Sequence, residues 1–252
     1  MTSQNKNKEF SYFEYRNIIE HYQPKIKDFS EVTKDDESFC VLRHDVEFVL
    51  ERALKMAEID HEYGIVSSFF IQVMNSAYNP LSIKNKKILK QLRRLGHKVG
   101  LHLYLSHIDE ENPDILLEEL EEQAKILEIC INDSVDRFSY HRPPKWVLPI
   151  DLSDRTSLIN AYSSNYFEYL IENNLPKKIK YYSDSNHKWS YGHPLDEEKY
   201  SRFQLCIHPD EWTEFGGDDI DNFKNMLHQS RKIFMDNIDS EYKTFSGIRK
   251  YL

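Results

Sequence analysis

Short apolar runs alternate along this chain with longer segments of helical periodicity, and this alternation limits the fold more than any other feature. Helical spacing is predicted over 11–22, 49–63, 83–95, 112–127 and 220–238. Strands are predicted at 39–44, 67–73, 98–103, 137–140, 158–162, 179–182 and 203–207. Strands separated by helices favour a parallel sheet, because parallel neighbours need a long crossover connection.

The number of these units indicates one domain rather than two. The chain has 252 residues and only 7 glycines, and no low-complexity linker divides it. We therefore predict a single α/β domain over residues 1–252, folded as a closed or nearly closed β/α barrel of seven strands. A doubly wound open sheet is the alternative, but no glycine-rich phosphate loop follows the first strand.

Charge and cysteine content restrict the partners and the compartment. The formal net charge is -9, and no long basic stripe is present, so neither nucleic acid nor an anionic membrane surface is expected as the main partner. No stretch is long enough to span a bilayer, and the first nine residues lack the apolar region of a signal peptide. Cys40, Cys130 and Cys206 are scattered without a CxxC pair, which fits a reducing compartment. We predict a cytoplasmic protein.

The first predicted strand ends abruptly in charge. Arg43, His44, Asp45 and Glu47 follow its apolar residues within five positions. In an extended chain Asp45 and Glu47 point to the same side, where one carboxylate could bind a cation and the other could hold or take a proton. The alternative is a solvated strand end that Arg43 neutralises.

Titratable residues also follow four later strands. They are His102 with His107 beyond it, the pair His141 and Arg142, then Asp184, and finally His208. The carboxyl ends of barrel strands carry the active site, so these side chains are candidates for one centre. Each also has a structural interpretation: a hydrogen-bonded core histidine at 102, an arginine at a sheet edge at 142, and a turn-forming aspartate at 184.

The order of these motifs resembles a known family. The segments are Arg43 to Glu47, Gly64 to Phe70, Gly96 to His102, Tyr140 to Pro143, Tyr182 to Ser185 and Ile207 to Pro209. Over roughly residues 39–215 they resemble the polysaccharide deacetylase superfamily (NodB-homology, carbohydrate esterase 4-like), and most closely its branch associated with surface-polysaccharide genes. The resemblance implies a distorted seven-stranded β/α barrel.

The resemblance also implies proton-transfer roles for four residues. Asp45 matches the general base of the family, and His208 matches its general acid. Arg142 matches the arginine that orients the base, and Asp184 matches the acidic residue near the catalytic histidine.

A divalent cation is implied as well, with zinc as the expected ion. Glu47 matches the carboxylate ligand and His102 the first histidine ligand. The chain departs from the family at two points: the carboxylate is usually aspartate, and the second histidine usually lies four residues after the first, where this chain has Ser106 and then His107. His107 could complete the site from a bulged segment, two protein ligands and water could suffice, or the site could have decayed.

These observations predict a metal-dependent hydrolase that removes an acetyl or similar acyl group from an N-acylated sugar or surface-polysaccharide precursor. The alternative is a non-catalytic carbohydrate-binding member of the same fold with a degenerate metal site. An iron oxygenase with two histidines and one carboxylate is disfavoured by the predicted barrel. The sugar, the acyl group and the oligomeric state stay open.

Overall fold

The computed structural model describes residues 9–108, 111–168, 179–196, 200–242 and 249. Its strands form one sheet in which every pair of neighbours is parallel, in the order β6-β5-β4-β3-β2-β8-β7. The bounds are β2 (Phe39–Val46), β3 (Ser68–Ile71), β4 (Lys98–Tyr104), β5 (Arg137–His141), β6 (Ile159–Asn160), β7 (Lys180–Ser183) and β8 (Arg202–Ile207).

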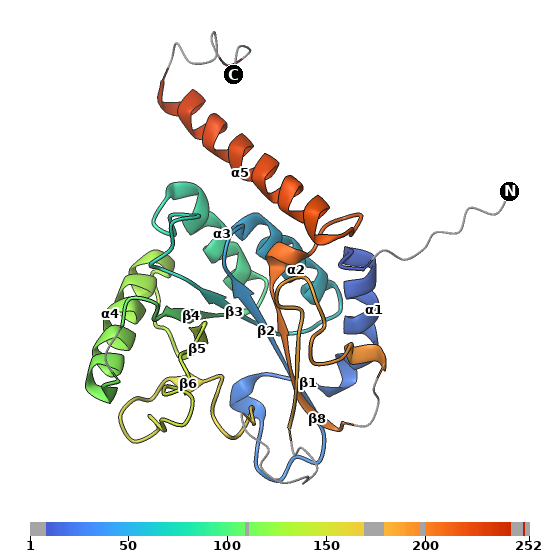
Figure 1. Cartoon of the computed structure of the whole chain (residues 1–252), viewed down its shortest axis with the longest axis vertical. Helices are drawn as coiled ribbons and strands as arrows, with labels where there is room; N and C mark the ends of the chain where they lie inside the picture. Colours follow the sequence, from blue (N-terminus) through green and yellow to red (C-terminus); the bar gives the residue numbers. More distant parts are fainter. Residues whose placement is uncertain (1–8, 109–110, 169–178, 197–199, 243–248, 250–252) are drawn as a thin grey trace, which may run out of the picture.

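The sheet curls into a half-barrel (Figure 1), and within the described residues no ladder joins its ends, β6 and β7. This confirms the predicted distorted seven-stranded α/β barrel, with each predicted strand in its expected place. A further strand, β1 (Ile26–Lys27), pairs with the start of β2 through Ile26 and Cys40. The sequence did not predict β1, because two residues are too few to show a periodicity.

The helices pack against the outer face of the sheet, except for the last one, which projects beyond it. They are α1 (Tyr12–Tyr22), α2 (Leu50–Glu62), α3 (Ile83–Arg94), α4 (Pro113–Ile131) and α5 (Asp219–Glu241), with short 3₁₀ turns η1 (Gln23–Lys25), η2 (Phe29–Glu31), η3 (Pro194–Asp196) and η4 (Pro209–Glu211). Leu92 of α3 and Leu120 of α4 share one core cluster with Leu101 and Leu103 of β4. Apolar side chains on the outward positions of the strands make this contact with the helices. The inward positions alternate with them and can therefore carry polar side chains.

The amino end of the barrel interior is filled by a buried charge cluster. The guanidinium of Arg137 bonds Asp28 and donates to the Ser68 hydroxyl at 2.8 Å. Gly100 makes room for it, because a Cβ there would lie 2.6 Å from Arg137 Cγ and 2.8 Å from the Phe70 ring. Because these side chains fill the amino end of the barrel interior, the carboxyl ends of the strands form its open end.

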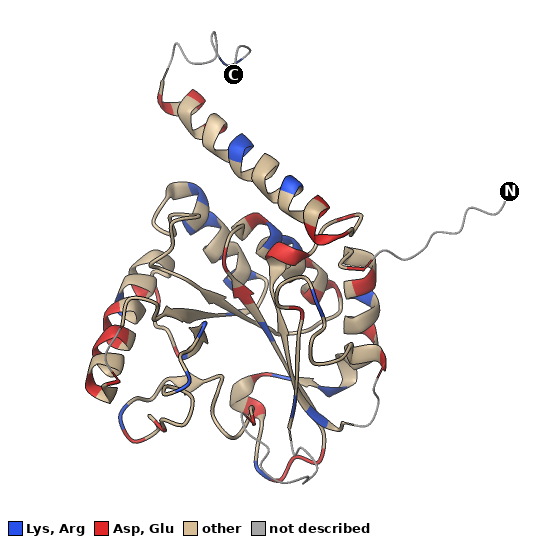
Figure 2. Ribbon diagram, in the orientation of Figure 1, with Lys and Arg blue, Asp and Glu red and all other residues tan. Residues whose placement is uncertain are grey.

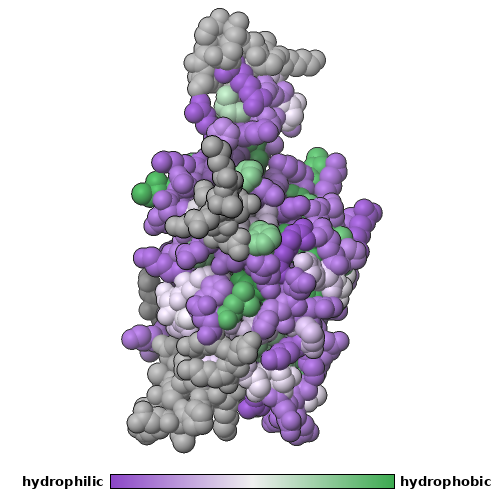
Figure 3. All heavy atoms as spheres, turned by 90° about the vertical axis from the view of Figure 1, so that its right-hand side faces the viewer, coloured by the Kyte–Doolittle hydropathy of each residue, from purple (hydrophilic) through white to green (hydrophobic). Residues whose placement is uncertain are grey.

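Helix α5 has the predicted position, but most of its large apolar side chains are exposed. Met226 is buried, whereas Phe223, Leu227 and Phe234 are 53%, 68% and 64% exposed. The helix projects beyond the barrel (Figures 1 and 3), so its far half has no sheet to cover. Arg52 of α2 anchors the near half through the Asn222 and Gln229 side chains.

The three cysteines are free and buried. In the part of the chain that the structure describes, no helix combines the length and apolarity needed to cross a membrane. Basic side chains are dispersed over the described elements rather than joined into one stripe, and acidic ones gather on α4 (Figure 2).

Candidate active site

Alternation along the strands brings the predicted carboxylates into the open end of the barrel. Asp45 and Glu47 point inward at the end of β2, while His44, which precedes Asp45, points outward and hydrogen-bonds the Tyr15 hydroxyl at 2.8 Å. Register extends the pattern to the neighbouring strands, because His102 of β4 pairs with Ser139 of β5.

Glu47, His102 and His141 form a compact group of potential metal ligands. Glu47 Oε1 lies 2.9 Å from His141 Nδ1 and 3.4 Å from His102 Nε2, and these two nitrogens are 3.3 Å apart. Burial alone would raise the pKa of Glu47, but hydrogen bonds from His102 and His141 hold it well below its ordinary value. The carboxylate is therefore ionised and ready to act as a ligand.

The donor set of this group fits a divalent cation. Zinc ligands of these types lie about 2.0–2.2 Å from the ion, which puts neighbouring ligand atoms of a tetrahedral site about 3.3–3.6 Å apart. The two distances from His102 Nε2, 3.4 and 3.3 Å, match that spacing, and the distance of 2.9 Å between Glu47 and His141 is somewhat shorter. The ligands would be one carboxylate and two imidazoles. The Glu47 side chain is 16% exposed, so a water or substrate oxygen could approach from solvent.

His107 does not join this group. Its Nε2 lies 3.0 Å from Glu119 Oε1 of α4, and its side chain is 38% exposed. The second imidazole beside Glu47 instead comes from His141, the last residue of β5, whose ring stacks on Tyr104. His107 stands five residues after His102, beyond the end of β4, and its side chain lies outside the barrel. The end of the adjacent strand β5, which carries His141, faces the same centre as His102.

Asp45 is bonded by an arginine from its own strand. Arg43 Nη2 donates to Asp45 Oδ2 at 2.7 Å, and the guanidinium also stacks over the Tyr162 ring and bonds Gln204. Burial alone would raise the pKa of Asp45, but the positive charge of Arg43, with lesser effects of nearby histidines, lowers it. Arg142 is exposed and has a positive φ of 45°, so the arginine beside Asp45 is Arg43.

Asp184, which is buried, and His208, which is partly buried, form a pair next to Asp45. His208 Nδ1 lies 2.6 Å from Asp184 Oδ1, and the other Asp184 oxygen accepts the Trp212 indole N–H at 2.6 Å. This contact commits Nδ1 of His208 to Asp184 and leaves Nε2 for the site. Burial alone would lower the pKa of His208, but neighbouring Cys206 and the Asp184 carboxylate raise it well above its ordinary value.

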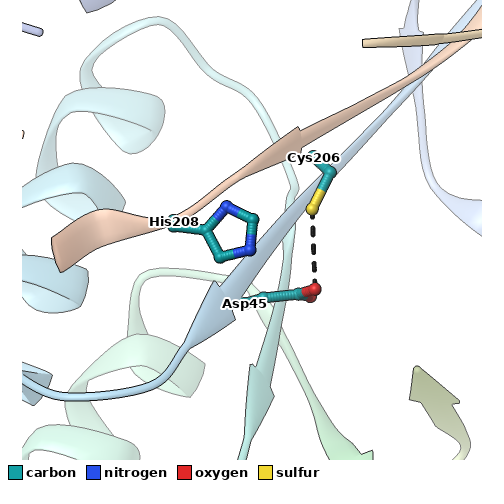
Figure 4. Close-up of side chains that lie close together, drawn as sticks. All are labelled: Asp45, Cys206 and His208. Carbon is teal, nitrogen blue, oxygen red and sulfur yellow. Dashed lines mark hydrogen bonds between the residues drawn. The ribbon is translucent and has the colours of Figure 1, made fainter. Parts of the chain in front are cut away.

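Figure 4 shows the His208 ring beside the Asp45 carboxylate, with the Cys206 thiol donating to Asp45 Oδ2 at 3.5 Å. Ligand atoms of Asp45, Cys206 and His208 lie within 4.8 Å of one another, so this second group also has the spacing of a metal site. The guanidinium of Arg43 and the raised pKa of His208 place positive charge there. A cation is therefore favoured at the Glu47 group, and the second group is better suited to proton transfer.

Ser139 connects the two groups. Its Oγ lies 2.8 Å from His102 Nδ1 and 3.4 Å from Asp45 Oδ1. With the lone pair of His102 Nε2 turned to a metal ion, its Nδ1–H would donate to Ser139, whose hydroxyl would then donate to Asp45. Such an outer hydrogen bond fixes the tautomer and orientation of a ligating imidazole.

The sequence indicated His141 as a strand-end candidate without a ligand role, and it gave no site role to Arg43, Ser139 or Cys206. Period-two alternation alone would have found Arg43, two positions before Asp45, and Cys206, two positions before His208. Ser139 and His141 follow only from the register of β5 against β4, in which Ser139 pairs with His102. The second histidine ligand was predicted from its spacing to His102 along the sequence, whereas in the structure it comes from the end of a neighbouring strand.

Comparisons with known proteins give matches among solved structures alone. No family model matches the chain. No curated protein matches it. A CE4 family pseudoenzyme from Bacillus anthracis is 13% identical, with a TM-score of 0.47 over 78% of this chain, and this chain spans 62% of the length of that one.

Two further solved structures are similar to this chain. The peptidoglycan deacetylase PdaC from Bacillus subtilis is 11% identical, with a TM-score of 0.46 over 87% of this chain and 100% of its own. A family 4 carbohydrate esterase from Streptomyces lividans, in complex with acetate, is 10% identical, with a TM-score of 0.40 over 69% of this chain and 80% of its own. Likeness at this level does not define an activity.

Proposed function

We propose that this protein is a metal-dependent hydrolase that removes an acetyl or similar acyl group from the nitrogen of an N-acylated sugar or surface-polysaccharide precursor. The observation that carries the proposal is the adjacency of two unlike groups at one barrel end. Glu47, His102 and His141 have the spacing of metal ligands, and Asp45 lies 3.8 Å from His102, with the His208 ring beside the Asp45 carboxylate (Figure 4).

A divalent ion held by Glu47, His102 and His141 would polarise the amide carbonyl and lower the pKa of a water molecule, and zinc suits one carboxylate and two imidazoles. This chain's own residues would move the protons. Asp45 accepts a proton from the attacking water as its oxygen bonds to the acyl carbon. His208 Nε2 donates a proton to the leaving nitrogen as the C–N bond breaks, which yields a carboxylate and an amine.

The electrostatics of the two proton carriers match these roles. Arg43 lowers the pKa of Asp45, so the carboxylate is ionised near neutral pH and can accept a proton. The environment of His208 raises its pKa, so the imidazole carries the proton that it must deliver. Groups whose environments push their pKa values apart in this way are typical of acid–base pairs.

The test is turnover with controlled metal content. Protein loaded with zinc is incubated with N-acetylated and O-acetylated sugars, and free amine and free acetate are both quantified. We expect amine release from N-acetylated substrates, its loss after chelation, and its return on adding zinc. Stoichiometric zinc without amine release from any N-acyl sugar would contradict the hydrolase and favour a carbohydrate-binding role.

A further inference from the structure

Gln72 carries a buried side-chain donor that nothing in the described part of the chain accepts. The side chain is 2% exposed, and its Nε2 has no hydrogen-bond partner among the described residues. An amide N–H that is buried without a hydrogen-bond partner destabilises the folded protein. Such a group in a folded protein needs an explanation, and a partner that arrives with a ligand is one.

The position of Gln72 places it in the layer of the metal-ligand group. Val46 of β2 pairs with Ile71 of β3, and Ile71 pairs with Leu101 of β4. One residue further along each strand, Gln72 therefore lies between Glu47 and His102. Phe70 faces the barrel interior, where Arg43 lies over its ring, and Gln72, two positions later, faces inward as well.

The hydrogen bonds of Asn75 determine which atom of the Gln72 amide, the oxygen or the nitrogen, points away from Asn75. Asn75 Oδ1 accepts the backbone N–H of Ala77, so the atom that Asn75 offers to Gln72 is its Nδ2. Nδ2 donates to Gln72 Oε1 at 2.7 Å and also to the backbone carbonyl of Glu47. The Gln72 oxygen is thus committed to Asn75, and the free Nε2 is the uncommitted end.

The backbone of Glu47 is anchored more firmly than its carboxylate. Asp210 accepts the N–H groups of Glu47, Phe48 and Val49, and Asn75 bonds the Glu47 carbonyl. The carboxylate is held through Oε1 by the two histidines that would have to turn their lone pairs to a metal ion. Glutamate also has one more rotatable bond than aspartate, so this ligand needs an additional anchor.

We propose that Gln72 is a positioning residue for the metal centre, and that its Nε2 donates to the Glu47 carboxylate when that carboxylate binds a divalent ion. This inference rests on the proposed metal site. Ligating carboxylates are typically held by outer hydrogen bonds, and losing such a partner weakens metal binding about 10–100-fold. Gln72 touches neither the ion nor the substrate.

The experiment measures zinc affinity by competition with a chromophoric chelator, with no substrate present. Gln72→Met keeps the side-chain length and removes the donor, and we expect its zinc affinity to fall by about 10–100-fold. Tyr78→Phe is the matched control, because the Tyr78 hydroxyl accepts the backbone N–H of Gln72 and supports the same turn. Its zinc affinity should stay within about threefold of that of the unmodified protein.

Each result decides the matter. Equal affinity of Gln72→Met and the unmodified protein, or equal weakening by Tyr78→Phe, would overturn the role of Gln72 and leave the metal site standing. An unmodified protein that takes up no zinc would overturn the metal site and this inference together. Should Gln72→Met fail to fold, side-chain amide exchange in the unmodified protein replaces it: zinc should slow exchange of the Gln72 NH₂ by at least about tenfold, and an unchanged rate would overturn the proposal.

Discussion

Replacing Asp45 with asparagine is expected to reduce turnover of an N-acylated sugar by about 10²–10⁴-fold, the range typical of removing one proton-transfer group. The amide keeps the shape of the carboxylate and can still accept the hydrogen bond from Arg43. It cannot take a proton from water. Zinc content should be unchanged, because Asp45 lies outside the group formed by Glu47, His102 and His141.

Asp136→Asn makes the same chemical change away from the site and serves as the control. Asp136 pairs with Arg137, and its side chain is 54% exposed. Turnover by the Asp136→Asn variant should therefore match that of the unmodified protein. Steady-state rates are compared at equal zinc content. Turnover by Asp45→Asn within about threefold of the unmodified protein would remove Asp45 from the mechanism.

His141→Ala is expected to abolish tight zinc binding, whereas His107→Ala is expected to retain it. His141 Nδ1 lies 2.9 Å from the Glu47 carboxylate, while His107 bonds Glu119 on the outside of the barrel. Loss of a direct ligand should weaken zinc affinity by more than the roughly 10–100-fold typical of an outer partner. Titration with a competing chelator measures both variants.

The two variants distinguish two interpretations of the metal site. In the sequence-based interpretation His107 could complete the site, whereas in the structure His141 is the second imidazole beside Glu47. Loss of zinc in His107→Ala with retention in His141→Ala would mean that the segment after β4 rearranges to complete the site. The same loss in both variants would indicate that Tyr104, whose ring lies nearly parallel to both imidazoles, couples them.

The sequence was sufficient to predict the barrel because each strand carries its own signal. Apolar runs bounded by charged residues mark the positions of β2, β4 and β8 in the sequence. The helices between the strands favour parallel pairing. Burial of α5 could not be predicted, because its apolar spacing is that of a packed helix. Only the structure shows that α5 projects beyond the sheet (Figure 1) and that Phe234 is exposed.

The candidate site was predicted in part for a physical reason. Asp45 and Glu47 share a strand, so their common direction follows from alternation alone. The approach of His141 to Glu47 depends on strand order and register, which a single sequence does not contain. Arg43 was expected to neutralise strand-end charge, and it does so at Asp45 rather than in solvent.

The measurement that tests the central claim most directly is the position of the bound ion. Crystals of the zinc-loaded protein would be measured on both sides of the zinc absorption edge, so that the anomalous difference locates the metal. The account predicts one ion about 2.0–2.2 Å from Glu47, His102 and His141. An ion held instead by Asp45, Cys206 and His208, or no anomalous peak at the carboxyl end of the barrel, would contradict it.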